Sequence, residues 1–267
     1  KWGRKQMSER EKILRYYRAS GEGDLAARLL DAGENAQRNR KYKVSEFLDP
    51  HGYSIAETIG AHYKNLQLVS NGGYPGAERV KVIFVNEEFR GTPDGNIEAV
   101  AVKWDERYYE LTHRDVLGAL MGLGVKREVI GDIIMCGHGC QIIIDSSLSS
   151  FILQNLTMIG AAPAIVSSLS LSEIAPREEK TKEIRTTVSA LRLDVVAAAG
   201  FGTSRTTMSD EIGVGKIKVN WKDAKNSAKA IKVGDIISMR GRGRVEVCEV
   251  LGQTKKGRTS ILLKRFM

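Results

Sequence analysis

The chain has 267 residues, of which 41 are Lys or Arg and 32 are Asp or Glu, so its formal net charge is +9. No apolar run approaches the roughly 18 residues of a membrane-spanning helix, which argues against an integral helical membrane protein. Its three cysteines form an odd and sparse set, which favours a reducing compartment over a disulfide scaffold.

Residues 1–78 are expected to form a mainly helical N-terminal region. Apolar side chains recur at helical spacing through residues 8–43. Pro50 predicts the end of this stretch, because proline disfavours helix at the residue before it. A further helix is predicted at 54–65. The Gly-rich loop at 70–79 reads as a domain junction, in which Arg79 either contacts phosphate or belongs to a simple turn.

Residues 79–175 are predicted to form a mixed α/β domain. In chain order the patterns indicate strands at 80–85 and 97–104, a helix at 116–124 opened by a capping box at 112–115, a hairpin at 132–145, a helix at 147–160 and a strand at 164–174. This order fits a βαββαβ ferredoxin-like sandwich with small additions. The polar, charged residues 176–187 are predicted to be a linker.

The excess positive charge is confined to residues 188–267. This segment has 16 Lys or Arg and 7 Asp or Glu, a difference of +9, whereas residues 1–187 have 25 of each. Charge concentrated in one module suggests a polyanionic partner. Nucleic acid is the commonest such partner of a compact basic domain, and an acidic membrane surface is the alternative.

The basic module is predicted to begin with a helix at 191–200 that ends at Gly200. A second helix is expected to start at a Ser204 or Thr203 cap and to end at Gly215. Residues 216–222 then read as a strand with polar and apolar side chains on opposite faces. The polar face is predicted to hold Lys216, Lys218, Asn220 and Lys222.

A second basic row is predicted within residues 234–250. Arg240, Arg242 and Arg244 recur at every second position, separated by glycines. Two rows of cations at strand spacing fit a groove for phosphates, and the alternative is a merely solvated strand face.

Several short motifs in this module resemble the S-four domain, the small RNA-binding module of ribosomal small-subunit protein four. They are RLD at 192–194, SR at 204–205, Gly215, KVN at 218–220 and VGDII at 233–237, in that order. The sequence departs from the pattern at Trp221, where many members have Gly after the Asn, so the resemblance leaves open the turn after the strand.

Nearly the whole chain resembles the YlmH-type proteins. The matching stretches include FLDP at 47–50, GGYPGAER at 72–79 and THRDVLGALMGLGVKREVIGDI at 112–133. The resemblance implies an α+β chain with a helical N-terminal region, an RRM-like ferredoxin-type middle domain and a small α/β S-four-type domain at residues 188–267. It also implies a role on the ribosome, in rescue of stalled translation on large subunits that hold peptidyl-tRNA.

We therefore expect a non-enzymatic protein that binds ribosomal RNA of the large subunit, with tRNA as a second RNA partner and with no cofactor, metal, membrane or small-molecule substrate. The location expected is the bacterial cytoplasm, or the plastid stroma in a plant or alga. Ser204 and Asn220 are expected to cap a helix, fix a turn or donate one hydrogen bond, and the basic residues to neutralise phosphates. The expected RNA-binding residues are Arg192, Ser204, Arg205, Lys216, Lys218, Asn220, Lys222, Arg240, Arg242 and Arg244.

Other readings of the sequence remain. Cys136, His138 and Cys140 suggest a metal, but their spacing is not that of a zinc site. An RNA-modifying enzyme, of the pseudouridine synthase or methyltransferase type, is the second hypothesis, although neither a catalytic Asp motif nor a cofactor loop is found. A third is a protein-interaction adaptor linked to cell division or photosystem assembly. The middle domain either contacts RNA or serves as a scaffold, since its strands offer only Phe84 and Trp104 for stacking on bases.

Overall fold

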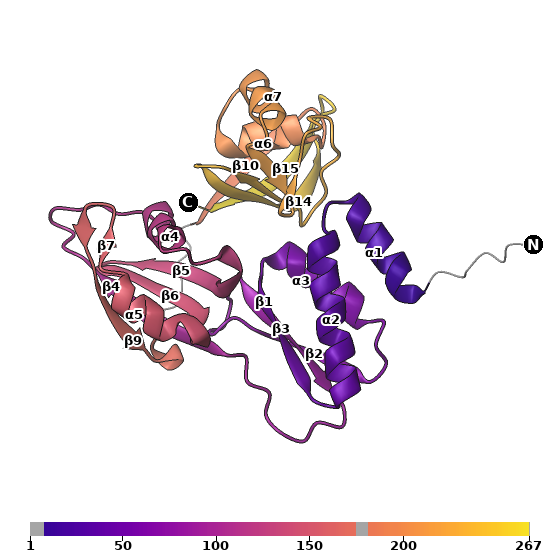
Figure 1. The fold of residues 1–267 in the computed structure, drawn as a ribbon. Coiled ribbons are helices and arrows are strands. Elements are labelled where there is room, and N and C mark those ends of the chain that lie inside the picture. Colours follow the sequence, from indigo (N-terminus) through magenta and orange to yellow (C-terminus); the bar gives the residue numbers. More distant parts are fainter. Residues whose placement is uncertain (1–7, 175–180, 267) are drawn as a thin grey trace, which may run out of the picture. The chain divides into compact units, whose positions relative to one another are not determined.

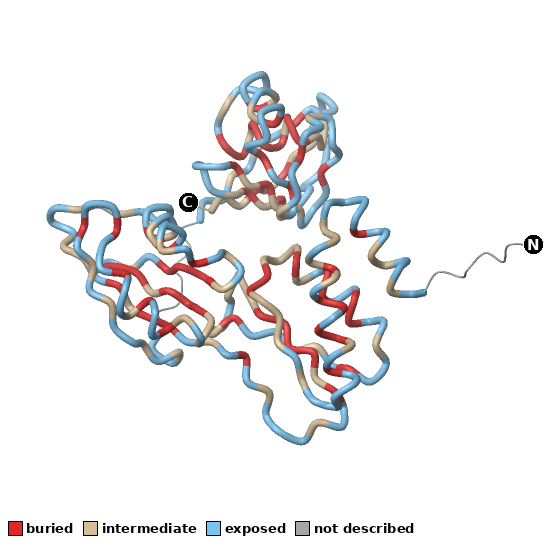
Figure 2. Tube along the Cα trace, in the orientation of Figure 1, coloured by how far each residue is buried: buried red, intermediate tan, exposed pale blue. Residues whose placement is uncertain are grey.

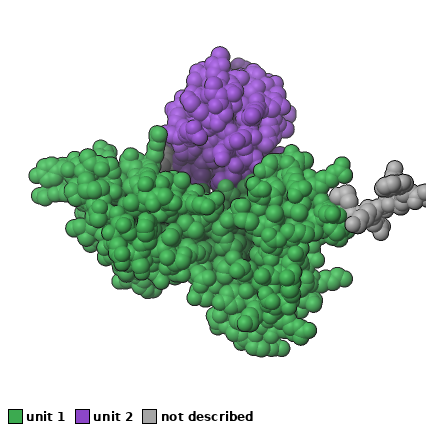
Figure 3. All heavy atoms as spheres, viewed as in Figure 1, with its two compact units in different colours: residues 1–177 green, residues 178–267 purple. Residues whose placement is uncertain are grey.

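The computed structural model describes residues 8–174 and 181–266. The chain divides into two compact units, residues 1–177 and residues 178–267, drawn in green and purple in Figure 3. Helices and antiparallel sheets alternate along the chain, so the fold is of the predicted α+β class. Within the described ranges, no helix is both long enough and apolar enough to cross a bilayer.

The N-terminal part of the first unit combines helices with a three-stranded sheet (Figure 1). Its elements are α1 (Glu9–Ala19), α2 (Gly23–Asn39), β1 (Tyr42–Leu48), α3 (Pro50–Gly60), β2 (Leu66–Asn71) and β3 (Val80–Asn86). Strand β3 lies between β1 and β2 and is antiparallel to both. Leu29 of α2, Ile59 of α3 and Phe84 of β3 share one buried core, and the buried positions run along these elements in Figure 2.

Two predictions for this part are wrong. Residues 42–48 form β1 rather than the end of a helical region, because α2 ends at Asn39 and Arg40 takes a left-handed φ of 50°. The strand predicted at 80–85 to open the middle sheet is β3, the central strand of the N-terminal sheet. Pro50 begins α3 as its first residue, a position that proline tolerates because the missing N–H has no partner there.

The middle part of the first unit is the predicted βαββαβ sandwich. Its elements are β4 (Ile97–Lys103), α4 (His113–Gly122), η1 (Arg127–Val129), β5 (Ile130–Cys136), β6 (Gly139–Asp145), η2 (Ser146–Leu148), α5 (Ser149–Asn155), β7 (Met158–Ile159), β8 (Ala162–Pro163), β9 (Ile165–Leu169) and η3 (Leu171–Glu173). The main sheet has the antiparallel order β5-β6-β4-β9, and β7 pairs with β8. Helices α4 and α5 share a buried core with one face of the sheet. Helix α5 is shorter than the predicted 147–160, because β7 and β8 form a small hairpin there.

The other face of the middle sheet is occupied in part by the N-terminal region. Phe47 of β1 packs in a buried cluster with Ala99 of β4 and Ile143 of β6. Beside the Phe47 ring, the buried Lys81 of β3 forms an ion pair with the partly exposed Asp145 and donates to the carbonyl of Asn96 at 2.8 Å. The N-terminal region therefore covers part of this sheet face, which is not available there to bind a ligand.

The glycine-rich loop at 70–79 is a structural turn. Asp132 of β5 accepts hydrogen bonds from the Tyr74 hydroxyl (2.7 Å) and from the Glu78 and Arg79 amides (2.8 and 3.1 Å). The Arg79 guanidinium donates to the carbonyls of Phe47 (2.8 Å) and Ile130 (3.0 Å), and burial lowers its pKa. Because these carbonyls already engage the side chain, Arg79 is part of the connection between the two sheets rather than a free phosphate ligand.

The second unit is a six-stranded antiparallel sheet with two helices. Its elements are β10 (Thr181–Val188), α6 (Leu193–Phe201), α7 (Arg205–Gly213), β11 (Ile217–Val219), β12 (Lys222–Asp223), β13 (Ile236–Met239), β14 (Gly243–Gln253) and β15 (Thr259–Phe266), in the sheet order β10-β15-β14-β13-β11-β12. The core holds Phe201 of α6, Met208 and Ile212 of α7, and the inner residues of β13, β14 and β15.

Only part of the predicted linker at 176–187 lies within the described residues. Residues 175–180 lie outside them, but residues 181–187 belong to β10, which pairs along its whole length with β15. The prediction of a linker is therefore wrong for this part. Ile184 and Val188 of β10 contribute to the core, and the neighbouring charges of Lys182, Glu183 and Arg185 obscure this pattern in the sequence.

Candidate nucleic-acid interface

The N-terminal ends of α6 and α7 meet at a buried carboxylate. Asp194, whose side chain is 4% exposed, accepts Nε (3.1 Å) and Nη2 (3.1 Å) of Arg192. It also accepts Nε of Arg205 at 2.7 Å. The two arginine side chains remain 39% and 57% exposed. One carboxylate thus fixes two guanidinium groups whose remaining N–H donors face solvent.

The charge on this carboxylate is maintained by its two partners. Burial alone would raise the pKa of Asp194, but hydrogen bonds from Arg205 and Arg192 outweigh it and hold the pKa below its ordinary value. Arg205 at the first position of α7 would by itself oppose the helix dipole, but its ion pair with Asp194 offsets this unfavourable interaction. Our sequence reasoning attributed this arginine to a phosphate and gave Asp194 no role, although the RLD motif contains it.

The start of α7 is capped as predicted by Ser204. Its hydroxyl oxygen accepts the Thr207 N–H at 3.0 Å. The preceding helix ends one residue later than expected: α6 runs through Gly200 to Phe201, and Gly202 is its left-handed cap with φ of 64°. Gly200 has another purpose, because a Cβ there would lie 2.8 Å from a methyl group of Val245. This glycine allows α6 to approach β14 closely.

The predicted row of lysines on one strand is wrong. Strand β11 ends at Val219, and Asn220 and Trp221 form a two-residue turn with φ of 51° and 63°. Positive φ at both central residues is typical of the tight hairpin turn, whose second position favours glycine. Trp221 adopts that conformation without being glycine, so the turn of the S-four pattern is retained despite the departure.

The hairpin places the lysines differently from a continuous strand. Lys218 of β11 lies opposite Asp223 of β12, with which it forms an ion pair at 3.8 Å. Lys222 of β12 lies opposite Val219 of β11. Asn220 fixes the turn, because its Oδ1 accepts the Ile236 N–H (2.9 Å). Its role is the turn-fixing one that the sequence suggested for it.

Arg240 and Arg242 lie in the turn between β13 and β14, so the prediction that they belong to a strand row with Arg244 is wrong. Both are exposed. The Arg240 amide donates to the carbonyl of Lys216 at 3.0 Å, which brings this turn beside the start of β11. Lys216 also forms an ion pair with Glu211 of α7 at 2.7 Å. Arg244 stacks instead on Phe266, 4.5 Å from the ring centre.

The structure thus arranges the candidate residues in two groups. Arg192 and Arg205 bind Asp194, with Ser204 next to Arg205 in the chain, and Lys216, Lys218, Arg240 and Arg242 lie around β11 and the turn after β13. Lys229, which the sequence did not single out, also lies beside the first group. Its side chain is exposed, and its backbone carbonyl accepts the Leu193 N–H at 2.9 Å. The four lysines of residues 222–232 could have indicated this further cation in the sequence.

The Cys136–Cys140 segment is the turn of the β5–β6 hairpin. Burial raises the pKa of the Cys140 thiol to about 12, and His138 lies 3.3 Å from Glu106. In the part of the chain that the structure describes, no three His, Cys, Asp or Glu side chains are grouped to hold a metal ion.

Three family profiles match successive parts of the chain. They are described as "YlmH, N-terminal" at residues 22–89, "Putative RNA-binding domain in YlmH" at 92–173 and "S4 domain", the S-four domain, at 191–237. The last match contains α6, α7 and the β11–β12 hairpin, and therefore both Asp194 and Lys218.

Two relatives extend this likeness over larger parts of the chain. A Bacillus subtilis protein named "Ribosome-associated protein quality control protein P2" is 32% identical over 232 residues, which are 86% of this chain and 89% of the relative. A solved structure titled "Cell division protein ylmH from Streptococcus pneumoniae" is similar in fold, with a TM-score of 0.50 at 19% identity over 58% of this chain and 95% of that one. The chain therefore belongs to the YlmH family of RNA-binding proteins and carries an S-four domain at its C-terminal end.

Proposed function

We propose that this protein is a non-enzymatic factor that binds structured ribosomal RNA of the large subunit, with tRNA at the same site, in the rescue of stalled translation. The observation that carries the proposal is the exposed cationic surface around Asp194 and β11, in the segment that holds the entire net charge of the chain.

The geometry of this surface suits the backbone of a folded RNA. Arg192 and Arg205 are held by Asp194 and keep further N–H donors in solvent, so their loss of side-chain entropy on binding a phosphate is reduced. Lys218, 53% exposed and only 3.8 Å from a single exposed carboxylate, can exchange that weak surface pair for a phosphate. Structured RNA is recognised largely through phosphates and 2′-hydroxyls, for which such donors are suited.

The place of action is supported by the Bacillus subtilis relative, whose name assigns it to ribosome-associated quality control. Identity of 32% over most of both chains supports the same role and a cytoplasmic location here. A chain without catalytic turnover is consistent with the sequence, in which we find no catalytic Asp motif of a pseudouridine synthase and no Gly-rich cofactor loop of a methyltransferase.

Sedimentation of cell lysate tests the proposal directly. The full chain should sediment with free large subunits, and a double variant Arg205→Ala, Lys218→Ala should remain at the top of the gradient. A matched control is Arg90→Ala combined with Lys64→Ala, which removes two exposed cations from the first unit. Equal sedimentation of the two double variants would contradict the assignment of the surface.

A second measurement tests the absence of turnover. Ribosomal RNA incubated with the full chain and S-adenosylmethionine, then mapped nucleotide by nucleotide, should show no new modification. A modified uridine or a methylated base at a defined position would make the protein an RNA-modifying enzyme.

A further inference from the structure

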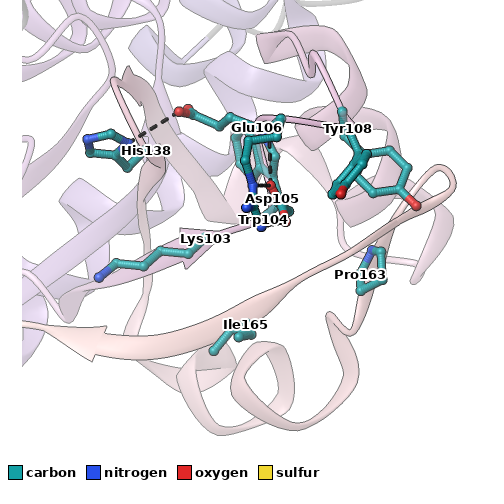
Figure 4. Close-up of a pocket in the computed structure, with 10 residues that line it drawn as sticks. Lys103, Trp104, Asp105, Glu106, Tyr108, His138, Pro163 and Ile165 are labelled. Carbon is teal, nitrogen blue, oxygen red and sulfur yellow. Dashed lines mark hydrogen bonds and ion pairs between the residues drawn. The ribbon is translucent and has the colours of Figure 1, made fainter.

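A hollow of about 790 Å³ opens at the end of β4, in the middle part of the first unit (Figure 4). Three segments surround it: the last residue of β4 with the loop that follows, the turn of the β5–β6 hairpin, and residues 163–165 at the end of β8 and the start of β9. It holds three aromatic side chains, Trp104, Tyr108 and Tyr109. None of them belongs to the basic surface of the second unit.

The open sheet face of this domain does not offer the usual platform for bases. RRM-type domains stack bases on aromatic side chains of the two central strands. Here those strands are β4 and β6, and register puts Ala99, Ala101, Gln141 and Ile143 together on one face. Ala99 and Ile143 are covered by Phe47 of the N-terminal region. Trp104, Tyr108 and Tyr109 lie instead in the loop beyond β4.

The loop that carries them is held by its own hydrogen bonds. The Asp105 carboxylate accepts Nε (3.0 Å) and Nη2 (2.7 Å) of Arg107, and the Asp105 carbonyl accepts the Tyr108 and Tyr109 amides at 3.2 and 3.1 Å. Arg107 lies 5.6 Å from the centre of the Tyr108 ring. Tyr108 is nevertheless 76% exposed. An exposed ring on a pre-ordered loop is a low-entropy surface for stacking.

The charges around the hollow favour an uncharged ring over a phosphate. Arg107 is balanced by Asp105, and Glu106 faces His138 at 3.3 Å. Lys103, at the edge of the hollow in Figure 4, has no acidic partner within ion-pair distance among the described residues. On the far side Ile165 is 74% exposed, an apolar contact for the other face or edge of a planar ligand.

We propose that this hollow binds an unpaired base of single-stranded RNA, stacked on Tyr108 between the 104–109 loop and Ile165, while Lys103 neutralises a neighbouring phosphate. The inference rests on the proposed RNA-binding function and adds a second, base-contacting site outside the S-four domain. It is supported by the family profile of an RNA-binding domain that spans all of these residues.

The test uses the full chain and two single-stranded RNAs of about twelve nucleotides, one with normal bases and one abasic at its central positions, within the site sizes typical of such proteins. The unaltered chain should bind the base-bearing RNA roughly tenfold more tightly than the abasic one. Tyr108→Ala should lose that preference, and Tyr108→Phe should retain it. The control is Tyr16→Ala, which removes a ring of similar exposure (72%) from α1.

Ultraviolet cross-linking to the base-bearing RNA, with mapping of the linked peptide, gives an independent readout at residues 104–109. A base preference that survives Tyr108→Ala, with circular dichroism unchanged, overturns the proposal, as does an equal loss for both RNAs. Weakened binding of Tyr108→Ala to RNA-free large-subunit proteins, with RNA affinities unchanged, would make the hollow a protein-docking site and overturn it too. The proposed function fails separately, if Arg205→Ala with Lys218→Ala leaves sedimentation with large subunits unchanged.

Discussion

Replacing Asp194 with Asn tests whether one buried carboxylate both stabilises the S-four domain and positions its arginines. The side chain receives three hydrogen bonds from two guanidinium groups, at 2.7 to 3.1 Å. A hydrogen bond to a charged group contributes about 1.5–3 kcal/mol, and a neutral acceptor keeps about half of that. Because both arginines are partly exposed, water replaces some of the loss. We expect the free energy of unfolding to fall by about 2 kcal/mol.

Thermal unfolding followed by circular dichroism measures this loss. For a unit of this size, about 2 kcal/mol corresponds to a midpoint lower by roughly 10 °C. The matched control is Asp210→Asn, the same change at an exposed position of α7, which should shift the unfolding free energy by less than about 0.5 kcal/mol. Equal midpoints for the two variants would refute the stabilising role of the cluster.

The pH dependence of the unfolding free energy tests the same contribution of Asp194 independently. The folded pKa of Asp194 lies below its unfolded value of about 4, so its contribution is fully present above that pH. It declines as the pH falls toward the folded pKa, because the unfolded chain then binds more protons. The Asp194→Asn variant should therefore lose less stability than the unaltered chain between about pH 5 and pH 2.

RNA affinity separates positioning from charge. Asp194→Asn removes a negative charge, which by itself would strengthen binding to a polyanion. If the carboxylate orients Arg192 and Arg205 toward phosphates, affinity should instead fall by roughly fivefold, about 1 kcal/mol, while Asp210→Asn should not weaken it. Stronger binding by both variants in a filter assay at a temperature where both are folded would show that orientation is unimportant.

Four other changes have expected outcomes that follow from the same structure. Arg205→Ala and Lys218→Ala should each weaken RNA binding by about 1–2 kcal/mol and lower the slope of log affinity against log salt by about one, and unchanged slopes in a salt titration would exclude phosphate contacts at both. Gly200→Ala should destabilise the second unit by about 1–3 kcal/mol despite the better helix propensity of alanine, since its Cβ would lie 2.8 Å from buried Val245, and a raised unfolding midpoint would contradict this. A fragment of residues 178–267 should unfold at higher denaturant than one of 189–267, which lacks β10 and leaves β15 an open edge, and equal midpoints in urea would show that β10 adds no stability.

Features that depend on residues close together in the sequence could be predicted, and features that depend on contacts between distant segments could not. The Ser204 cap, the β5–β6 hairpin and the βαββαβ order of the middle part were predictable, because each depends on residues a few positions apart. The confinement of charge to residues 188–267 was equally visible and indicated the RNA-binding module. The lysine row failed for a local reason that periodicity misses: Asn220 and Trp221 both adopt positive φ, and a tryptophan gives no sign of it.

By itself the sequence determined the local elements, the basic module and the family pattern, because hydrophobic period, capping residues and charge composition act through near neighbours. Only the tertiary structure decided that β3 belongs to the N-terminal sheet and that residues 181–188 complete the last one. It also decided that Arg205 is held by Asp194, eleven residues earlier. Pairing of this kind depends on which distant segments meet when the chain closes on its cores, and no periodicity in a single stretch of sequence contains that information.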